Sequence, residues 1–214
     1  YEDDCLLIIN KQPNVAIHPS MLHYDNNLSN GVKFYFDSIG LKKKIRPVNR
    51  LDRNTSGLVI FAKNEYVQEF LIKQMQNNTF SKEYLAILEG ILNEKKGTII
   101  APIARKKDSI IERCIDESGD FSITHYKVIK EFNNLSLVNF KLETGRTHQI
   151  RVHSSYIGHP ILGDDLYGNK SSLICRQALH SYKISFTHPK TLKKMCFEID
   201  LPKDMLSILN NELI

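Results

Sequence analysis

One carboxylate in this sequence stands between two fixed cations. Asp52 lies between Arg50 and Arg53, just ahead of a Thr-Ser-Gly turn at residues 55–57. Opposite charges within a few ångströms favour the ionised carboxylate, which is the form that a nucleophile or a general base needs at neutral pH. A solvated ion cluster on the surface is the alternative interpretation, because most charge clusters carry no chemistry. Asp52 is therefore a candidate catalytic group whose role depends on its surroundings.

Positive charge is concentrated just before Asp52. Residues 42–53 contain six lysines and arginines against one acid, whereas the whole chain of 214 residues has 29 Lys and Arg against 24 Asp and Glu, a net charge of +5. A cationic patch around a carboxylate suits a polyanionic substrate, whose phosphates require positive charge. A solvated basic loop remains the alternative for the lysine run at residues 42–44.

Composition excludes several classes of protein. A hydrophobic content of 42% is ordinary for a globular protein, and no linker-like stretch divides residues 1–214, so we expect a single domain. The four cysteines are far apart and indicate reduced thiols in a cytoplasmic protein. No cysteine or histidine spacing is typical of a metal site, and no apolar run or signal peptide points to a membrane. The chain starts without methionine, so we expect a segment to precede it.

The Asp52 loop should lie between two strand-like pieces, residues 47–51 and residues 58–62. Residues 6–9 form an apolar run of strand length, and residues 58–62 form a continuous apolar run typical of a buried strand. Pro47 favours an extended backbone ahead of the loop. Helices are predicted from Val32 to Gly40 and from an Asn64 cap to residue 77.

The second half of the chain predicts more strands than helices. Residues 82–90 read as a strand that carries Tyr84, and two consecutive asparagines between residues 122–132 and 135–142 predict a hairpin. The charged sequence beyond Gly97 predicts an exposed excursion with short strands. Residues 178–186 and 195–201 should be strands, and residues 202–209 a short closing helix.

Residues 143–153 form the second stretch with chemical potential. A strand should end at Leu142, turn at Gly145, and lead into a helix whose apolar face includes Ile150 and Tyr156. Such a junction directs backbone N–H groups and a positive dipole outward. Arg146 and Arg151 lie close to this junction.

Four motifs together resemble one family. Residues 50–57, 82–84, 144–151 and 159–168 resemble, in order, the motifs of the RluA-type RNA pseudouridine synthases. Any one of them would be a weak match alone. The resemblance covers residues 6–201, and four motifs on compatible elements make chance an unsatisfactory explanation.

The resemblance implies an α+β fold, with a mixed, largely antiparallel β-sheet, flanking helices and a central RNA-binding cleft. It also implies a reaction without cofactor or metal, in which a uridine in RNA is cut at its N1–C1′ bond, turned, and rejoined through C5. We expect a cytoplasmic monomer that acts on ribosomal RNA in preference to transfer RNA. A small RNA-binding domain is expected ahead of Tyr1.

The resemblance assigns three catalytic residues. Asp52 matches the catalytic aspartate, either as a nucleophile at C1′ or as a base on the sugar 2′ proton. Tyr84 matches the tyrosine that stacks on the target uracil, and Arg151 matches the basic residue that pairs with the aspartate. Flipping a base out costs a few kcal/mol, about 1–3 kcal/mol of which a stacked aromatic returns. Substrate contacts are expected from Arg50, Arg146 and Ile150.

The sequence departs from the family pattern at three positions. Asn49 and Asn54 stand where histidine and aspartate are frequent, and Gln12 interrupts a usual lysine-proline pair. No reacting group is lost, so substrate choice or fine positioning is affected more than catalysis. His148 is expected to be scaffold, since side chains at a strand–helix junction often satisfy backbone groups.

Two other functions compete with the enzyme. A non-catalytic RNA-binding module would be signalled by loss of the catalytic residues, which are all present. A hydrolase of nucleosides or glycosides would need a second acid opposite the first, for which Asp164 and Asp165 are the candidates.

Overall fold

The computed structural model describes residues 1–19 and 24–210. These residues form two compact units. The first comprises Tyr1–Ser81 and Ser181–Ile199, and the second comprises Lys82–His180 and Asp200–Ile214. The expectation of a single domain over residues 1–214 stays a prediction.

The first unit is built on an antiparallel arrangement of strands. Its strands are β1 (Leu6–Lys11), β2 (Arg46–Pro47), β3 (Ser56–Ala62), most of β10 (Leu179–Thr187) and β11 (Lys194–Glu198). β3 pairs with β1 and β2, and β10 pairs with β11. Every residue of β3 is buried, because an apolar run without alternation needs cover on both faces. The predicted strands at residues 6–9 and 58–62 are confirmed, with β3 starting two residues earlier.

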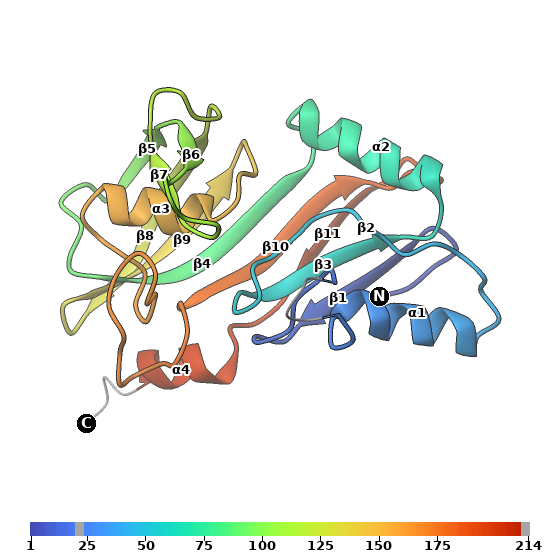
Figure 1. Ribbon diagram of the computed structural model, residues 1–214, viewed down its shortest axis with the longest axis horizontal. Coiled ribbons are helices and arrows are strands. Elements are labelled where there is room, and N and C mark those ends of the chain that lie inside the picture. The colour runs from blue at the N-terminus through green and yellow to red at the C-terminus, as the bar shows by residue number, and fades with distance from the viewer. Residues whose placement is uncertain (20–23, 211–214) are drawn as a thin grey trace. The chain divides into compact units, whose positions relative to one another are not determined.

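Two helices belong to the first unit, α1 (Leu28–Ser38) and α2 (Glu65–Gln76) (Figure 1). The side chain of Asn64 accepts a hydrogen bond from the Val67 N–H, so the predicted cap of α2 is confirmed. α1 begins four residues before the predicted Val32, because Asn27 caps it in the same way. Within α1, Phe36 is buried and Tyr35 is exposed.

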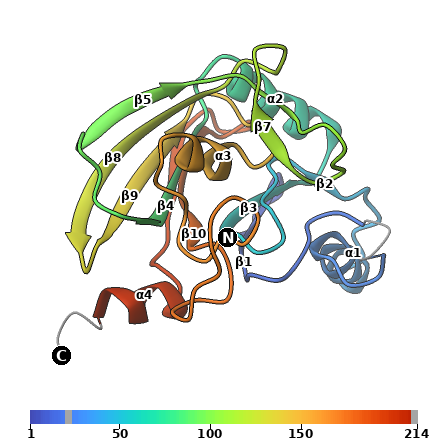
Figure 2. The same ribbon diagram turned by 60° about the vertical axis from the view of Figure 1, so that its left-hand side comes forward.

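The second unit contains a four-stranded antiparallel sheet in the order β4, β9, β8, β5 (Figure 2). Its strands are β4 (Ser81–Glu89), β5 (Lys96–Ile100), β8 (Ile123–Phe132) and β9 (Leu135–Leu142). A separate hairpin consists of β6 (Ile103–Arg105) and β7 (Arg113–Ile115), and the helices are α3 (Gln149–Tyr156) and α4 (Lys203–Asn210). Short strands were predicted beyond Gly97, and β6, β7 and most of β5 lie there.

The turn between β8 and β9 has the predicted conformation. Asn133 and Asn134 have φ angles of 43° and 58°, and asparagine tolerates this left-handed region better than most residues. The adjoining strands pair from Phe132–Leu135 onward. The hairpin predicted from this dipeptide is confirmed.

The fold is α+β, with a mixed, mostly antiparallel sheet and four helices in the described chain. The predicted fold class is thus confirmed. None of these helices is long and apolar enough to cross a membrane. All four cysteines are free thiols, as their spacing indicated.

Candidate active site

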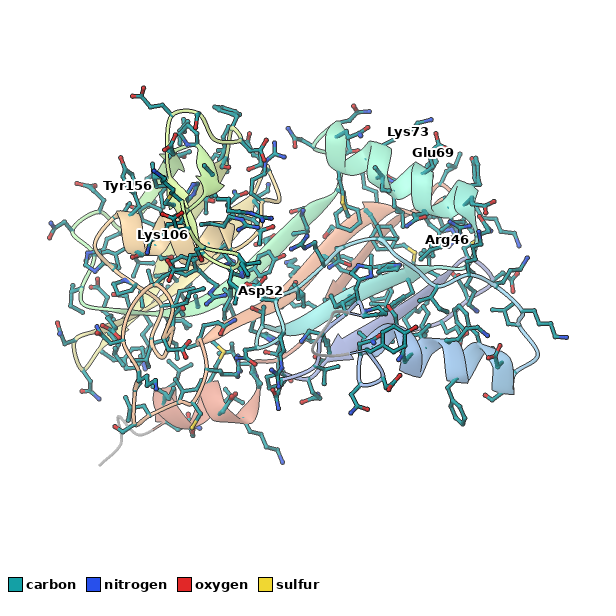
Figure 3. All side chains as sticks on the ribbon, viewed as in Figure 1. Arg46, Asp52, Glu69, Lys73, Lys106 and Tyr156 are labelled. Carbon is teal, nitrogen blue, oxygen red and sulfur yellow. The ribbon has the colours of Figure 1, made fainter. Side chains whose placement is uncertain are left out.

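Asp52 lies in the loop between β2 and β3 (Figure 3). Its carbonyl accepts a hydrogen bond from the Thr55 N–H at 3.1 Å, which closes a tight turn directly after the carboxylate. Thr55 and Ser56 are buried, whereas Asp52 is only partly buried and Arg50 and Arg53 are exposed. The loop therefore has a fixed base with its charged residues nearer to solvent.

A buried lysine also anchors the loop that carries Asp52. Lys11, at the end of β1, is 1% exposed. Its Nζ donates hydrogen bonds to the backbone carbonyls of Gln12, Val15 and Arg53, at 2.9, 2.9 and 3.0 Å. A buried ammonium requires such partners. Lys11 thus ties the turn after Asp52 to the end of β1, a role that the sequence alone did not reveal.

The segment before Asp52 is anchored by Asn49. The Asn49 side-chain amide donates to the Leu58 carbonyl at 3.0 Å, and its oxygen accepts from the Ile60 N–H at 2.9 Å. Asn49 is buried and continues the pairing along β3. Asn49, which stands where histidine is frequent in the family, therefore has a structural function in this chain.

The backbone at residue 57 requires glycine. Its φ is +118°, and an added Cβ would lie 2.2 Å from the Ser181 carbonyl oxygen on β10. Only glycine has this backbone conformation and lets the neighbouring strand come so close. The turn that follows Asp52 is consequently intolerant of substitution at this residue.

Tyr84 lies on β4, directly opposite Phe140 of β9. It is 6% exposed, which is also what cross-strand core packing produces. Its burial in the structure thus leaves the predicted stacking on uracil as a prediction.

Arg151 is held by a buried carboxylate in the second unit. Its Nε and Nη2 donate to the two oxygens of Asp164, both at 2.7 Å. The two side chains are 7% and 0% exposed. Such a bidentate pair fixes the plane of the guanidinium group. Asp164 is therefore committed to Arg151, which argues against its use as the second acid of a hydrolase.

Tyr167 extends this support. The Arg151 guanidinium carbon lies 5.0 Å from the centre of the Tyr167 ring. The Tyr167 hydroxyl is 2.7 Å from Nδ1 of His148 and accepts the Arg113 N–H at 2.8 Å. His148 itself has a left-handed backbone at the start of α3. These contacts agree with the expectation that His148 is scaffold.

The turn from Thr144 to Gln149 is organised by the Gln149 side chain. Its oxygen accepts hydrogen bonds from the Thr144 hydroxyl and the Arg146 N–H, both at 2.9 Å. Its nitrogen donates to the Ile123 carbonyl at 2.9 Å. Gln149, the first residue of α3, thus fixes the backbone that carries Arg146.

The predicted site residues fall into two groups. Arg50 and Asp52 belong to the first unit, and the second contains Tyr84, Arg146, Ile150 and Arg151. Within the second, the turn and α3 bring together Arg146, which is exposed, and Ile150, which is buried. Tyr156, expected on the buried face of α3, is exposed. The predicted RNA-binding cleft and the pairing of Arg151 with Asp52 stay predictions.

One group of described residues has the geometry of a metal site: Asp3, Cys5 and His188. Nδ1 of His188 accepts backbone N–H groups of Lys190 and Thr191, so Nε2 carries the proton and donates to Asp3 at 2.9 Å. A metal would require that nitrogen to be deprotonated. The group is better explained as a hydrogen-bonded link between the segment just before β1 and the turn after β10.

Comparison with known proteins identifies the class. A sequence profile for RNA pseudouridylate synthase matches residues 5–156. The chain is 42% identical over 212 residues to the uncharacterized RNA pseudouridine synthase YjbO of Bacillus subtilis (strain 168), covering 99% of this chain and 75% of that protein. It is 35% identical over 224 residues to ribosomal large subunit pseudouridine synthase D of Pseudomonas aeruginosa, covering 98% and 70%.

Solved structures agree with the sequence comparison. Human RNA pseudouridylate synthase domain containing 1 is 25% identical, with a TM-score of 0.75 over 99% of this chain and 92% of that one. Human RNA pseudouridylate synthase domain containing 4 shows the same fold, with a TM-score of 0.81 at 19% identity over 98% and 90%.

The chain therefore belongs to the RNA pseudouridine synthase family, as its four motifs predicted. It is an enzyme that isomerises uridine in RNA.

Proposed function

We propose that this enzyme converts specific uridines of ribosomal RNA to pseudouridine, with Asp52 acting on a nucleotide flipped out of the RNA. The observation that carries the proposal is the motif at residues 50–57, where Asp52 matches the catalytic aspartate of the family. Its loop is fixed from both sides, by Asn49 before the carboxylate and by Lys11 after it. A fixed loop suits a group that must meet its target in one geometry.

The reaction is an isomerisation, so it consumes no second substrate. The N1–C1′ bond breaks, the uracil turns, and a C5–C1′ bond forms, while the C5 proton is lost and N1 gains one. Asp52 starts as a carboxylate, either attacking C1′ or removing the 2′ proton. Tyr84 stacks on the uracil, and Arg151 stabilises the charged form of Asp52.

Three residues are proposed to hold the RNA substrate: Arg50, Arg146 and Ile150. Both arginines are exposed, as a phosphate contact requires. Ile150 is 4% exposed, so its contribution is to support the pocket wall more than to offer a large contact surface. The enzyme is proposed to act in the cytoplasm as a monomer and to need no cofactor.

Ribosomal RNA is the proposed target because several similar proteins carry that substrate in their names, including ribosomal large subunit pseudouridine synthase D of Pseudomonas aeruginosa. The test is to map pseudouridines in ribosomal and transfer RNA from cells with and without the gene. Loss of a ribosomal site is expected, with restoration by the wild-type gene but not by Asp52→Asn. Loss confined to transfer RNA would contradict the proposed target and leave the enzyme class intact.

A further inference from the structure

A cavity of about 560 Å³ lies within the second unit. Its walls come from the β6–β7 hairpin, from residues 118–120, and from the turn at residues 145–147. Cavities of this size, about 300–1,000 Å³, commonly hold ligands. The lining is mainly polar, which points to a charged ligand.

The cavity carries excess positive charge. Three arginines line it, Arg105, Arg113 and Arg146, against one acid, Asp120, so the lining carries +3 − 1 = +2. Arg146 Nη1 lies 3.9 Å from the Asp120 carboxylate, and Arg146 Nε donates to the Phe121 carbonyl at 3.3 Å. A single exposed acid therefore leaves most of the cationic charge available to a ligand.

Two of these arginines are placed at a cost to stability. Arg105 and Arg113 lie directly opposite each other in the antiparallel β6–β7 pair. Like charges at such positions destabilise a sheet. An anion bound between them would relieve this repulsion.

A fourth cation lies behind the turn. Lys82 on β4 is half-buried, and desolvation lowers its pKa. Its Nζ lies 3.1 Å from the position that a Cβ at Gly145 would occupy. No hydrogen bond or ion pair links Lys82 to another described residue of its unit. Because Gly145 has no side chain, the Lys82 ammonium group can approach the cavity wall.

We propose that this cavity binds a sugar-phosphate segment of the RNA substrate outside the target nucleotide, with Arg105, Arg113 and Arg146 on the phosphate. Guanidinium groups match phosphate oxygens in a bidentate geometry. The Ser118 and Thr147 hydroxyls add short polar groups that suit a ribose. The inference rests on the proposed function, because it takes RNA as the substrate.

The experiment compares arginine variants in RNA binding at several salt concentrations. Arg105→Gln and Arg146→Gln are measured by fluorescence anisotropy with a labelled ribosomal RNA fragment that the wild-type enzyme modifies. Each should weaken binding roughly tenfold and reduce the slope of log Kd against log salt by about 1. Arg105→Lys should keep the slope and lose only part of the affinity.

Lys107→Gln is the matched control. Lys107 is exposed on the same hairpin and does not line the cavity. Lys107→Gln removes the same charge from the same hairpin but leaves the cavity lining unchanged. It should therefore change RNA affinity much less than Arg105→Gln does. An equal loss in both variants would overturn the proposal, because general hairpin charge would then explain the binding. Unchanged Kd and slope in both arginine variants would overturn it as well.

Failure of this inference is distinguishable from failure of the proposed function. Turnover at saturating RNA should be unchanged in Arg105→Gln, with a raised KM. Wild-type turnover on the RNA with unaltered binding by the arginine variants would reject the phosphate subsite alone. Absence of turnover in the wild-type enzyme would reject the ribosomal substrate instead.

Discussion

Arg151 and Asp164 form a buried ion pair whose members depend on each other. Both contacts between them are 2.7 Å long, and removal of one partner leaves the other charge without compensation. Asp164→Asn should therefore lower the free energy of unfolding by about 3–5 kcal/mol, measured by urea denaturation.

Asp165→Asn provides the control for that prediction. Asp165 is the next residue and is exposed, so the same substitution should change stability by no more than about 0.5 kcal/mol. Similar effects at both positions would contradict the role given to the ion pair.

Lys11 should matter for turnover as well as stability. Lys11→Met keeps the length of the side chain and removes its hydrogen bonds to the backbone carbonyls of Gln12, Val15 and Arg53. We expect a loss of about 1–3 kcal/mol in stability and a lower kcat, since the turn after Asp52 is loosened. RNA affinity should change little. An unchanged kcat in the folded variant would show that this tie does not position the loop.

At the scale of elements, the β8–β9 turn offers a direct test. Asn134 has a φ of 58°, which a β-branched residue adopts only with strain. Asn134→Val should lower the free energy of unfolding by about 1–2 kcal/mol and with it the melting temperature. Asn134→Gly should leave both nearly unchanged. If both variants melt alike, the turn conformation is not what stabilises the hairpin.

Local signals predicted the elements well. The Asn64 cap, the Asn133-Asn134 turn and the apolar run of β3 act over a few residues, and each was found where the sequence placed it. The start of α1 was missed because its apolar periodicity begins a turn after its Asn27 cap.

Site residues that depend on distant contacts were not predictable in the same way. Lys11 reaches the carbonyl of Arg53, 42 residues away. The sequence marks Asp164 only as a candidate second acid, and its partner Arg151 lies on α3, 13 residues earlier. Family motifs located Arg151 but gave no information on what holds it.

At the scale of the whole molecule, buried histidines should make stability depend on pH. Burial, with the Arg176 charge, lowers the pKa of His180 to about 4 from its usual 6.5. Burial also lowers the pKa of His153. The unfolded chain takes up these protons below about pH 6.5 while the folded protein does not, so stability falls as pH decreases from 6.5 towards 4.

His180 alone should contribute a loss of about 2 kcal/mol between pH 7 and pH 5. The measurement is urea denaturation across that range for the wild-type protein and for His180→Gln. The variant, although less stable at pH 7, should show a shallower dependence on pH. An identical dependence in both proteins would contradict a neutral buried His180.

The central claim is that Asp52 drives uridine isomerisation, and release of tritium from RNA labelled at uridine C5 tests it most directly. The wild-type enzyme should release tritium without free uracil and without cleavage of the RNA chain. Asp52→Asn should abolish release, while Asp37→Asn, the same change on the exposed surface of α1, should retain it. Tritium release that persists in Asp52→Asn would contradict the account.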